Sequence, residues 1–411
     1  MSQATVGIVG LGYVGLALAK SICQNSNKVI GFDVDSIRVS ELMSAKSPNE
    51  SISSGDLFKF IQRDCFKATT DISELRGIDT VIIAVPTPLT ESGNPDYGPL
   101  ESACSTIASE LKSDALLINE STSHPGTLRD LIAPLIASKR DDSAKDIKFA
   151  CSPERVNPGD SQFCHANTPR VVSGLDDVAK NRVKEFYEKF VKDVFVASTP
   201  EVAEMSKLLE NSFRLINISF INEISDFCND KGIPVREVIA AASTKPFGFM
   251  PFYPGPGVGG HCIPVDPVYL LESAHRDGIR LPILEDAIKL NESRYKTIVE
   301  SLERQLNGLS GKKILIEGVT YKSNVRDTRE TPATRILSGL KDVGAQVSWH
   351  DPLIEAWNGG FSTPISAETW DAIIVLVFHD LTDVSDLMLN SKKIFDFTGR
   401  IPKSGEHVQS L

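Results

Sequence analysis

The chain has 411 residues, of which 41% are hydrophobic and 24% are charged, a composition typical of soluble globular proteins with two or three domains. Its net charge of −11 argues against non-specific binding to nucleic acid, so we expect no nucleic-acid partner. An anionic ligand would therefore need local clusters of Arg and Lys or the N-termini of helices.

The seven cysteines are scattered and contain no C-x-x-C pair. This pattern is typical of a reducing cytoplasm and argues against a disulfide framework and a structural zinc site, so we expect no metal. The apolar stretch at residues 6–19 lacks a basic flank, contains four glycines and is too short to span a bilayer. We interpret it as a strand, a turn and a helix, and we expect no targeting or membrane segment.

In the first half of the chain, short β-branched runs alternate with helical stretches. We expect strands at residues 5–9, 29–33, 80–85, 116–119, 148–151, 171–173 and 194–197. Such alternation predicts a parallel sheet with crossover helices. Polar or turn residues follow five of these strands, at Gly10, Asp33, Pro86-Thr87-Pro88, Glu120-Ser-Thr122 and Ser152-Pro-Glu154. Ligands of open α/β sheets lie beyond the carboxyl ends of strands, so these five loops are the candidate site.

Helical periodicity replaces the strand signal from about residue 199 to residue 304, with long helices expected at 201–231 and 281–306. The α/β rhythm then returns, with strands expected at residues 313–317, 346–350, 372–377 and 393–397. We therefore predict an α/β protein with two Rossmann-like doubly wound domains, residues 1–198 and 308–411, joined by a central helical region, 199–307, that contains a long helix. A central helical block of this kind often carries subunit contacts, so we expect a homodimer or a higher homo-oligomer. We expect the short polar C-terminal tail to be frayed.

The segment Gly10-Leu-Gly-Tyr-Val-Gly15 matches the G-x-G-x-x-G fingerprint of dinucleotide-binding proteins. It follows an apolar strand and opens a helix, and Asp33 lies at the end of the next strand. Gly10 permits the tight turn, Gly12 lets the backbone approach the pyrophosphate, and Gly15 lets helix and strand pack closely. Asp33 would accept hydrogen bonds from the adenosine ribose and repel a 2′-phosphate, which favours NAD over NADP. Arg38 lies close enough to leave NADP open.

Cys262 is the candidate nucleophile. A free cysteine is usually inert packing, and we expect this of the other six. Cys262 differs because four glycines precede it within residues 255–260, and such backbone can approach a ligand closely. A thiol in a protein that holds NAD suggests oxidation of an alcohol through a covalent sulfur intermediate. His261 is adjacent but neighbouring side chains often point apart, so we give it a minor role, whereas Asp266 could orient a base or a water.

Lys207 and Asn211 are four residues apart, on one face of the expected long helix. They could supply a cation and an amide to stabilise a developing oxyanion. The pattern alone equally allows an exposed charge beside a polar neighbour.

Seven motifs occur in order and together resemble the UDP-sugar dehydrogenase family, which includes the UDP-glucose, GDP-mannose and UDP-N-acetylhexosamine 6-dehydrogenases. They are the fingerprint with Asp33, Pro86-Thr-Pro88, Glu120-Ser-Thr122, Ser152-Pro-Glu-Arg-Val-Asn-Pro-Gly159, Glu204–Asn211, Gly257-Val-Gly-Gly-His-Cys262 with Asp266, and Tyr321-Lys-Ser-Asn-Val-Arg-Asp-Thr-Arg329. The resemblance covers nearly the whole chain. It implies a four-electron, two-NAD oxidoreductase that converts the C6 alcohol of a sugar to a carboxylate, with an N-terminal NAD domain, a central dimerising helix and a C-terminal UDP-binding domain.

The resemblance also implies roles for individual residues. Cys262 is similar to the nucleophile that forms a thiohemiacetal and a thioester, and Lys207 and Asn211 to the groups that stabilise the oxyanion. Asp266 matches an aspartate held near the catalytic water. Thr122 and Glu154 match residues that position or activate the water of hydrolysis.

Further positions match residues that contact the ligands. Lys322 and Arg400 correspond to positions that reach the substrate and its phosphates, and Arg329 to a position near the cofactor. Cofactor contacts are also expected from Gly10, Gly12, Tyr13, Val14, Gly15, Asp33, Arg38, Pro86, Thr87 and Thr122. Substrate contacts are also expected from Glu154, Arg155, Val156, Lys207, Asn211, Arg214, Phe252, Tyr253 and Gly257.

Two departures from the UDP-glucose enzymes indicate a branch within the family. Val265 replaces a common lysine and His261 a serine, and Pro158 replaces a second glutamate. Both departures resemble enzymes that act on UDP-N-acetylhexosamines, and the segments 252–256 and 263–267 look more like UDP-N-acetylglucosamine 6-dehydrogenases than the N-acetylmannosamine kind. Arg155 could contact the acetamido group or a neighbouring subunit. By analogy the product would feed a bacterial surface polysaccharide or O-antigen pathway.

Several alternatives stay open at this point. The substrate could be UDP-N-acetylmannosamine, UDP-glucose or GDP-mannose. A two-electron hydroxyacid or sugar-acid dehydrogenase of similar shape would not need Cys262. A non-catalytic sensor that binds NAD and a nucleotide sugar would need neither a nucleophile nor oxyanion partners.

Overall fold

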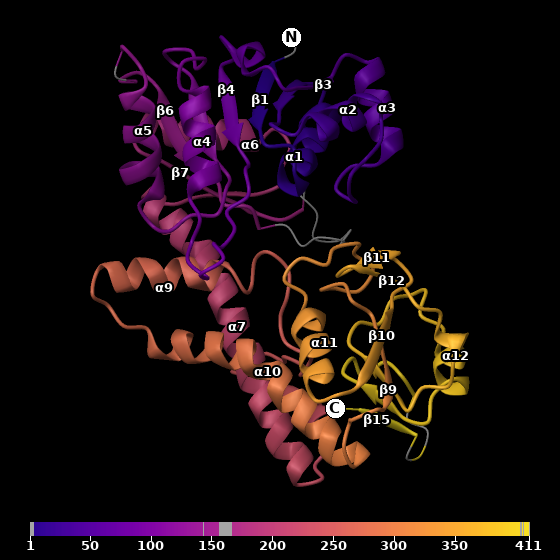
Figure 1. Ribbon diagram of the computed structural model, residues 1–411. Coiled ribbons are helices and arrows are strands. Elements are labelled where there is room, and N and C mark those ends of the chain that lie inside the picture. Colours follow the sequence, from indigo (N-terminus) through magenta and orange to yellow (C-terminus); the bar gives the residue numbers. More distant parts are fainter. Residues whose placement is uncertain (1–3, 143, 156–166, 403–404, 406, 411) are drawn as a thin grey trace. The chain divides into compact units, whose positions relative to one another are not determined.

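The computed structural model describes residues 4–142, 144–155, 167–402, 405 and 407–410. The chain divides into two compact units (Figure 1). The first comprises Met1–Glu210 and Glu272–Gly278, and the second comprises Asn211–Leu271 and Ile279–Leu411. None of the helices in the described part of the chain is long and apolar enough to cross a membrane. The three-part division at residues 198 and 307 stays a prediction.

The first unit contains an eight-stranded sheet in the order β3-β2-β1-β4-β5-β6-β7-β8. The strands are β1 (Thr5–Val9), β2 (Lys28–Phe32), β3 (Phe66–Thr69), β4 (Thr80–Ile83), β5 (Leu116–Asn119), β6 (Lys148–Cys151), β7 (Arg170–Gly174) and β8 (Val194–Val196). All neighbours are parallel except β6 and β7, which pair antiparallel. Strand β3 was not predicted, because this four-residue edge strand has no β-branched run and gains its strand character from pairing with β2.

Helices cover both faces of this sheet. They are α1 (Tyr13–Gln24), α2 (Ser36–Met43), α3 (Ser54–Gln62), α4 (Gly98–Ile107), α5 (Ala133–Ser138) and α6 (Asp177–Tyr187), with a 3₁₀ segment η1 (Ile72–Leu75) and a π-helical segment η2 (Leu128–Ile132). Consecutive residues of β1 pack into hydrophobic cores on opposite faces of the sheet: Ile8 packs with α1 and α6, and Val9 packs with α4. The central strands are therefore buried on both faces, which explains their continuous apolar sequence.

The second unit contains a parallel five-stranded sheet in the order β10-β9-β13-β14-β15. Its strands are β9 (Lys313–Glu317), β10 (Gln346–His350), β13 (Ala372–Val375), β14 (Ile394–Asp396) and β15 (Val408–Ser410), and a small hairpin is formed by β11 (Ala356–Trp357) and β12 (Gly360–Phe361). This is a doubly wound order whose switch point lies between β9 and β13. The expectation of a frayed tail is wrong for residues 408–410: Val408 is buried and pairs with Ile394 of β14.

The remaining helices are α7 (Pro200–Asp230), α8 (Val235–Ser243), α9 (Asp266–Arg276), α10 (Pro282–Leu306), α11 (Pro332–Asp342) and α12 (Val384–Leu389), with a 3₁₀ turn η3 (Ile365–Ala367). The continuous helix α7 begins in the first unit and ends in the second. In the second unit, α10 and α11 pack on one face of the sheet, and α12 packs on the other with Trp370. The prediction of two Rossmann-like α/β folds joined by a long helix is confirmed.

Candidate active site

The glycine turn after β1 has the geometry that a dinucleotide site requires. Gly10 has φ +98°, and a Cβ there would lie 2.5 Å from the carbonyl oxygen of Ala84. A Cβ on Gly15 would lie 2.0 Å from the carbonyl oxygen of Gly10, so this position also needs glycine. A Cβ on Gly12 would meet nothing within 4 Å, which leaves open space at the N-terminus of α1, where Tyr13 and Val14 begin the helix. Open space at the positive end of a helix dipole fits a pyrophosphate.

Asp33 closes the same turn. It is buried, and its Oδ2 accepts a hydrogen bond of 2.8 Å from the N–H of Leu11 while its Oδ1 accepts one of 3.0 Å from the N–H of Asp35. The guanidinium of Arg38 lies 3.1 Å from Asp33 and 3.7 Å from Asp35. Arg38, the cation that left NADP open as a cofactor, is thus paired with two carboxylates. The carboxylate of Asp33 would repel a 2′-phosphate.

The loops after β4 and β5 are tied together. Pro86 and the buried Thr87 follow β4. Just before them, the N–H of Val85 donates a hydrogen bond of 3.0 Å to Ser121 Oγ, and that hydroxyl donates one of 2.9 Å back to the carbonyl of Val85. Thr122 follows immediately, so two of the predicted loops share one edge of the sheet.

Lys207 and Thr122 are brought together, although they are 85 residues apart in sequence: Lys207 Nζ donates a hydrogen bond of 2.5 Å to Thr122 Oγ1. Lys207 is only 7% exposed, which excludes the interpretation of an exposed surface charge. One turn earlier, Glu204 accepts hydrogen bonds of 2.7 Å and 3.0 Å from the N–H groups of Gly126 and Leu128. Burial raises the pKa of Glu204 to about 7. The start of α7 is therefore anchored on the loop after β5.

Glu154 belongs to a buried charge cluster that sequence reasoning missed. The guanidinium of Arg170, 2% exposed, lies 3.0 Å from Glu154 Oε2 and donates hydrogen bonds of 3.0 Å to both carboxylate oxygens of Glu120. The ring of Tyr187 lies 4.9 Å beneath the guanidinium, and its hydroxyl donates to Glu120. Burial raises the pKa of Glu120 to about 7. The one signal in the sequence was an arginine at the start of a buried strand.

Arg155 has a partner within its own unit. Its guanidinium lies 2.5 Å from Glu210, and its backbone N–H donates a hydrogen bond of 2.7 Å to Glu154 Oε1. A contact of Arg155 with an acetamido group would have to compete with Glu210. Val156 lies outside the described residues.

In the second unit, Cys262 is exposed, whereas the other described cysteines, at positions 23, 65, 104, 151 and 228, are buried. Burial raises the pKa of the Cys23 and Cys104 thiols to about 12 and that of Cys151 well above its usual value. These thiols are inert, because the thiolate is the reactive form. Cys164 lies outside the described residues.

Asn211 and Asp266 meet beside the segment of Cys262. Asn211 Nδ2 donates a hydrogen bond of 2.6 Å to Asp266 Oδ2, and both side chains are buried. The N–H of Asp266, the first residue of α9, donates a hydrogen bond of 2.8 Å to the carbonyl of Cys262. The second unit thus joins the predicted nucleophile, aspartate and amide.

The glycine-rich segment before Cys262 is held by polar side chains. Gly257 has φ +115°, and Asn291 Oδ1 accepts a hydrogen bond of 2.8 Å from the N–H of Val258. Phe252 packs edge-on against Phe213, with ring centroids 5.7 Å apart. Arg214 is exposed on α7.

Arg236, which was not predicted as a site residue, lies beside Tyr253 and the strand end that precedes Arg400. The guanidinium of Arg236, in the first turn of α8, lies 5.8 Å over the exposed ring of Tyr253 and donates a hydrogen bond of 3.3 Å to the carbonyl of Phe397. Arg400, three residues later, lies 5.9 Å over the ring of Phe378. In the sequence, Arg236 looks like any exposed helix cation, and only the fold places it beside these residues.

Lys322 and Arg329 lie on the segment between β9 and α11, and Lys322 is half-buried. The hydrogen bond to Asp327 is the largest cause of a raised pKa of Arg329, and the charges of Asp327, Tyr321 and Cys262 add to it. The carbonyl of Arg329 accepts a hydrogen bond of 3.1 Å from the N–H of Gly260, two residues before Cys262. Its predicted contact with the cofactor stays a prediction.

Among the residues that the structure describes, no group of three His, Cys, Asp or Glu side chains is placed to hold a metal ion. The chain matches three consecutive domains of one family. These are the NAD binding domain of the UDP-glucose/GDP-mannose dehydrogenase family at residues 4–191, its central domain at 201–293 and its UDP binding domain at 315–402.

Relatives and solved structures agree with this match. The chain is 33% identical to the UDP-N-acetyl-D-glucosamine 6-dehydrogenase of Pseudomonas aeruginosa, over 92% of this chain and 91% of the relative. It is also 33% identical to the UDP-N-acetyl-D-mannosamine dehydrogenase of Methanocaldococcus jannaschii, over 91% and 85% respectively. The structure of a UDP-D-ManNAc dehydrogenase from Pyrococcus horikoshii superposes with a TM-score of 0.86 at 29% identity, covering 98% of both chains. The chain therefore belongs to the UDP-glucose/GDP-mannose dehydrogenase family of oxidoreductases, and its cofactor is NAD.

Proposed function

We propose that this protein oxidises the C6 hydroxyl of a UDP-N-acetylhexosamine to the uronic acid, with UDP-N-acetylglucosamine as the first candidate. One observation carries the proposal: Cys262 is exposed on a glycine-rich segment beside the Asn211–Asp266 pair, while the other described cysteines are buried. The same four-electron chemistry on UDP-N-acetylmannosamine is equally compatible with the named relatives.

NAD, when bound, accepts the two hydrides that the overall reaction releases. The alcohol, one water and two NAD⁺ give the carboxylate, two NADH and three protons. In this scheme the thiolate of Cys262 adds to the aldehyde carbon and forms a thiohemiacetal, which is oxidised to a thioester. Asn211 and Lys207 donate hydrogen bonds to the oxygen of these adducts. Thr122 and Glu154 orient the water that cleaves the thioester and returns the thiol.

The first experiment measures the NADH formed per mole of nucleotide sugar. UDP-N-acetylglucosamine, UDP-N-acetylmannosamine and UDP-glucose are compared with the purified protein. Two NADH from the first sugar alone support the proposal, and two from the second alone assign the mannosamine alternative. One NADH per sugar would refute the covalent scheme. No NADH from these three sugars or from GDP-mannose would favour a nucleotide-sugar sensor.

The covalent step has its own test. The proposal predicts that Thr122→Ala slows hydrolysis and lets an acyl-enzyme accumulate, which mass spectrometry of the intact protein detects as an added uronyl group. Cys262→Ala is the control, because it removes the attachment point and leaves Thr122 in place. An adduct that persists in the Cys262→Ala variant would place the chemistry elsewhere.

We also propose that two copies associate through α7. Phe213, Phe220 and Phe227 follow one another at seven-residue spacing on this helix, and their exposed fractions are 44%, 58% and 57%. Such spacing puts the rings in one stripe, and a second copy offers the same stripe. Light scattering should give a dimer mass, or a multiple of it, that Phe220→Glu lowers. An unchanged mass would exclude this surface.

The exposed thiol leads us to place the protein in the reducing cytoplasm.

A further inference from the structure

The turn after β9 in the second unit repeats the turn after β1 in the first. Gly318 has φ +83°, and a Cβ there would lie 2.3 Å from the carbonyl oxygen of Val377. Gly10 has the same constraint, against the carbonyl oxygen of Ala84. The N–H of Gly318 donates a hydrogen bond of 2.9 Å to the end of β10, as that of Gly10 donates one of 2.8 Å to the end of β2. Both units thus begin with the same strand–glycine turn.

The aspartate that closes each turn is used differently. Asp351 follows β10 as Asp33 follows β2, and its Oδ2 accepts a hydrogen bond of 2.8 Å from the N–H of Val319, as Asp33 Oδ2 accepts one from Leu11. Asp351 Oδ1 accepts a hydrogen bond of 2.8 Å from the N–H of Leu353, as Asp33 Oδ1 accepts one from Asp35. The side-chain partners differ: Asp351 Oδ2 lies 3.2 Å from His379 Nε2, whereas Asp33 is paired with Arg38. Burial opposes its ionisation, but the hydrogen bonds outweigh burial and lower the pKa of Asp351. Asp351 is therefore a charged anchor for protein groups.

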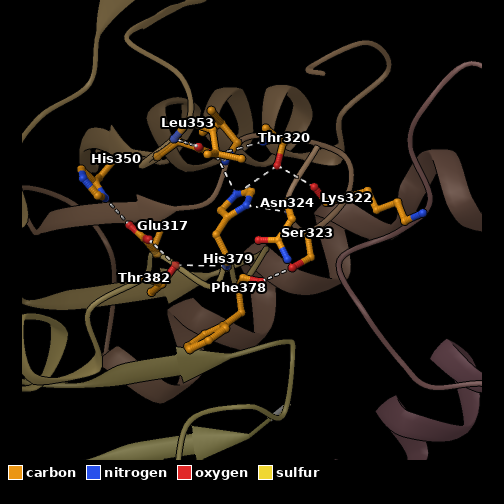
Figure 2. Close-up of polar contacts among 12 residues, drawn as sticks. Glu317, Thr320, Lys322, Ser323, Asn324, His350, Leu353, Phe378, His379 and Thr382 are labelled. Atoms are coloured by element: carbon orange, nitrogen blue, oxygen red, sulfur yellow. Dashed lines mark hydrogen bonds and ion pairs between the residues drawn. The ribbon is translucent and has the colours of Figure 1, made fainter. Parts of the chain in front are cut away.

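His379 lies after β13, on the other side of the switch point, and is fully buried. The N–H of Asn324 donates a hydrogen bond of 3.0 Å to His379 Nδ1 (Figure 2). Nδ1 is therefore an acceptor without a proton, and the ring proton belongs to Nε2, which lies 3.2 Å from Thr320 Oγ1 as well as from Asp351. One imidazole thus bonds to both the beginning and the middle of the segment after β9.

Further bonds hold this segment to the end of β13. The hydroxyl of Ser323 donates to the carbonyl of Phe378, and the N–H of Asp380 donates a hydrogen bond of 3.0 Å to Asn324 Oδ1. Asn324 has φ +60°, a left-handed conformation that asparagine tolerates. Residues 320–324 are therefore clamped against residues 378–380, and Figure 2 shows the amine of Lys322 extending away from His379.

The clamped segment also contacts the backbone before Cys262. A Cβ on Gly260 would lie 2.7 Å from a ring carbon of Tyr321, so the aromatic ring packs directly on this glycine. The N–H of Gly260 donates a hydrogen bond of 3.1 Å to the carbonyl of Arg329. Both ends of the segment 321–329 thus contact Gly260, two residues before Cys262.

We propose that His379 is a positioning residue of the candidate active site. Its Nε2–H form, held by Asp351, locks residues 320–324 to the end of β13. This lock sets the direction of Lys322 and, through Tyr321, the backbone that presents Cys262. The inference rests on the proposed function only for what Lys322 and Cys262 do in the reaction, because the lock is measurable without turnover.

The test uses the full-length protein with His379→Ala and His379→Gln, and His350→Gln is the matched control. His350 Nδ1 lies 2.6 Å from Glu317 at the end of β9, in the same network but away from residues 320–324 (Figure 2). Because a cation that is no longer held must be ordered when the ligand binds, we expect His379→Ala to weaken UDP affinity about tenfold by calorimetry. Alkylation of Cys262 by iodoacetamide should become faster, while NADH affinity stays unchanged. The glutamine, which can still donate to Asp351, should restore part of the loss.

Three results would overturn the inference. The first is a folded His379→Ala variant whose UDP affinity and alkylation rate stay within about twofold of the parent. The second is an equal loss in His350→Gln, which would make the effect a general one of stability. The third is weakened NADH affinity. If the His379 variants do not fold, Ser323→Ala removes one bond of the lock at a partly exposed position, and the same two readouts decide. A parent protein that binds UDP but oxidises no UDP-sugar would refute the proposed function and leave this test intact.

Discussion

The buried Arg170 cluster gives the sharpest prediction about stability. Arg170→Met replaces the guanidinium with an apolar side chain of similar length and leaves the carboxylates of Glu120 and Glu154 without their cation. Arg170 and Glu120 are 2% and 0% exposed as side chains. Removing one partner of a buried ion pair typically costs about 3–5 kcal/mol, because the other charge stays buried. The expected result is a loss of this size at pH 8.5.

The loss should depend on pH in a defined direction. Burial already raises the pKa of Glu120 to about 7, above its ordinary value, although the charge of Arg170 opposes this rise. Without Arg170 the folded-state pKa rises further, so the folded variant binds the proton more tightly than the unfolded chain. Its stability is therefore retained at low pH and falls, by up to about 1.4 kcal/mol per pH unit, as the pH rises through the new pKa. The deficit should be smaller at pH 6 than at pH 8.5.

Urea unfolding followed by two probes measures the effect. All three tryptophans, at positions 349, 357 and 370, lie in the second unit, so their fluorescence follows that unit while circular dichroism follows both. The dichroism transition should move and the fluorescence transition should stay. Arg76→Met is the matched control, because Arg76 lies 2.8 Å from Glu110 but is 71% exposed, and its midpoint should not change. An equal loss in both variants, or a loss independent of pH, would refute the reasoning.

Three further predictions concern the first unit. Gly15→Ala places a methyl group against the carbonyl of Gly10 and should abolish NAD binding or folding, whereas Gly12→Ala meets no protein atom and should weaken only NADH affinity, as fluorescence titration can show. Asp33→Ser removes the carboxylate that opposes a 2′-phosphate, so the ratio of kcat/KM for NAD to that for NADP should fall; an unchanged ratio would exclude Asp33 as the selecting group. Glu201 has its pKa lowered to about 2 chiefly by its hydrogen bond with Arg129, so its stabilisation, at most about 1 kcal/mol, is present above pH 4.5 and is lost as the pH falls toward 2. Arg129→Gln should remove this acid sensitivity from the urea midpoint.

The glycine turn could be predicted from the sequence because its constraints are local. Gly10 and Gly15 are required by atoms a few residues away or on the next strand, so spacing alone carries the information. The positions of the central strands could be predicted for a similar reason, because buried parallel strands show continuous apolar runs in the sequence. Strands β3 and β15 were missed because each is a short edge strand that depends on pairing with one neighbour.

The polar clusters could not be predicted from the sequence, because their members are distant in the chain. Glu120 and Arg170 are 50 residues apart, and Asp351 and His379 are 28 apart. The same applies to Lys207, whose four-residue spacing from Asn211 left an exposed surface position equally open. Its burial and its bond to Thr122 became visible only when the strand and the helix were placed together. The catalytic roles came from the resemblance to a family and stay predictions.

The two glycine turns place different groups where an anion could bind. In the first unit, α1 begins three residues after Gly10, so the positive end of the helix dipole lies at the turn itself. In the second unit, α11 begins only at Pro332, and residues 318–331 separate it from β9. This intervening segment carries Lys322, so we expect a side-chain cation to take the place of the helix N-terminus there. Because flexible cations bind anions well only when they are held in place, such a segment needs an internal anchor, and Asp351 provides one through its contact with His379. We therefore expect a lock such as that of His379 where the helix does not begin at the glycine turn and the aspartate after the neighbouring strand is kept.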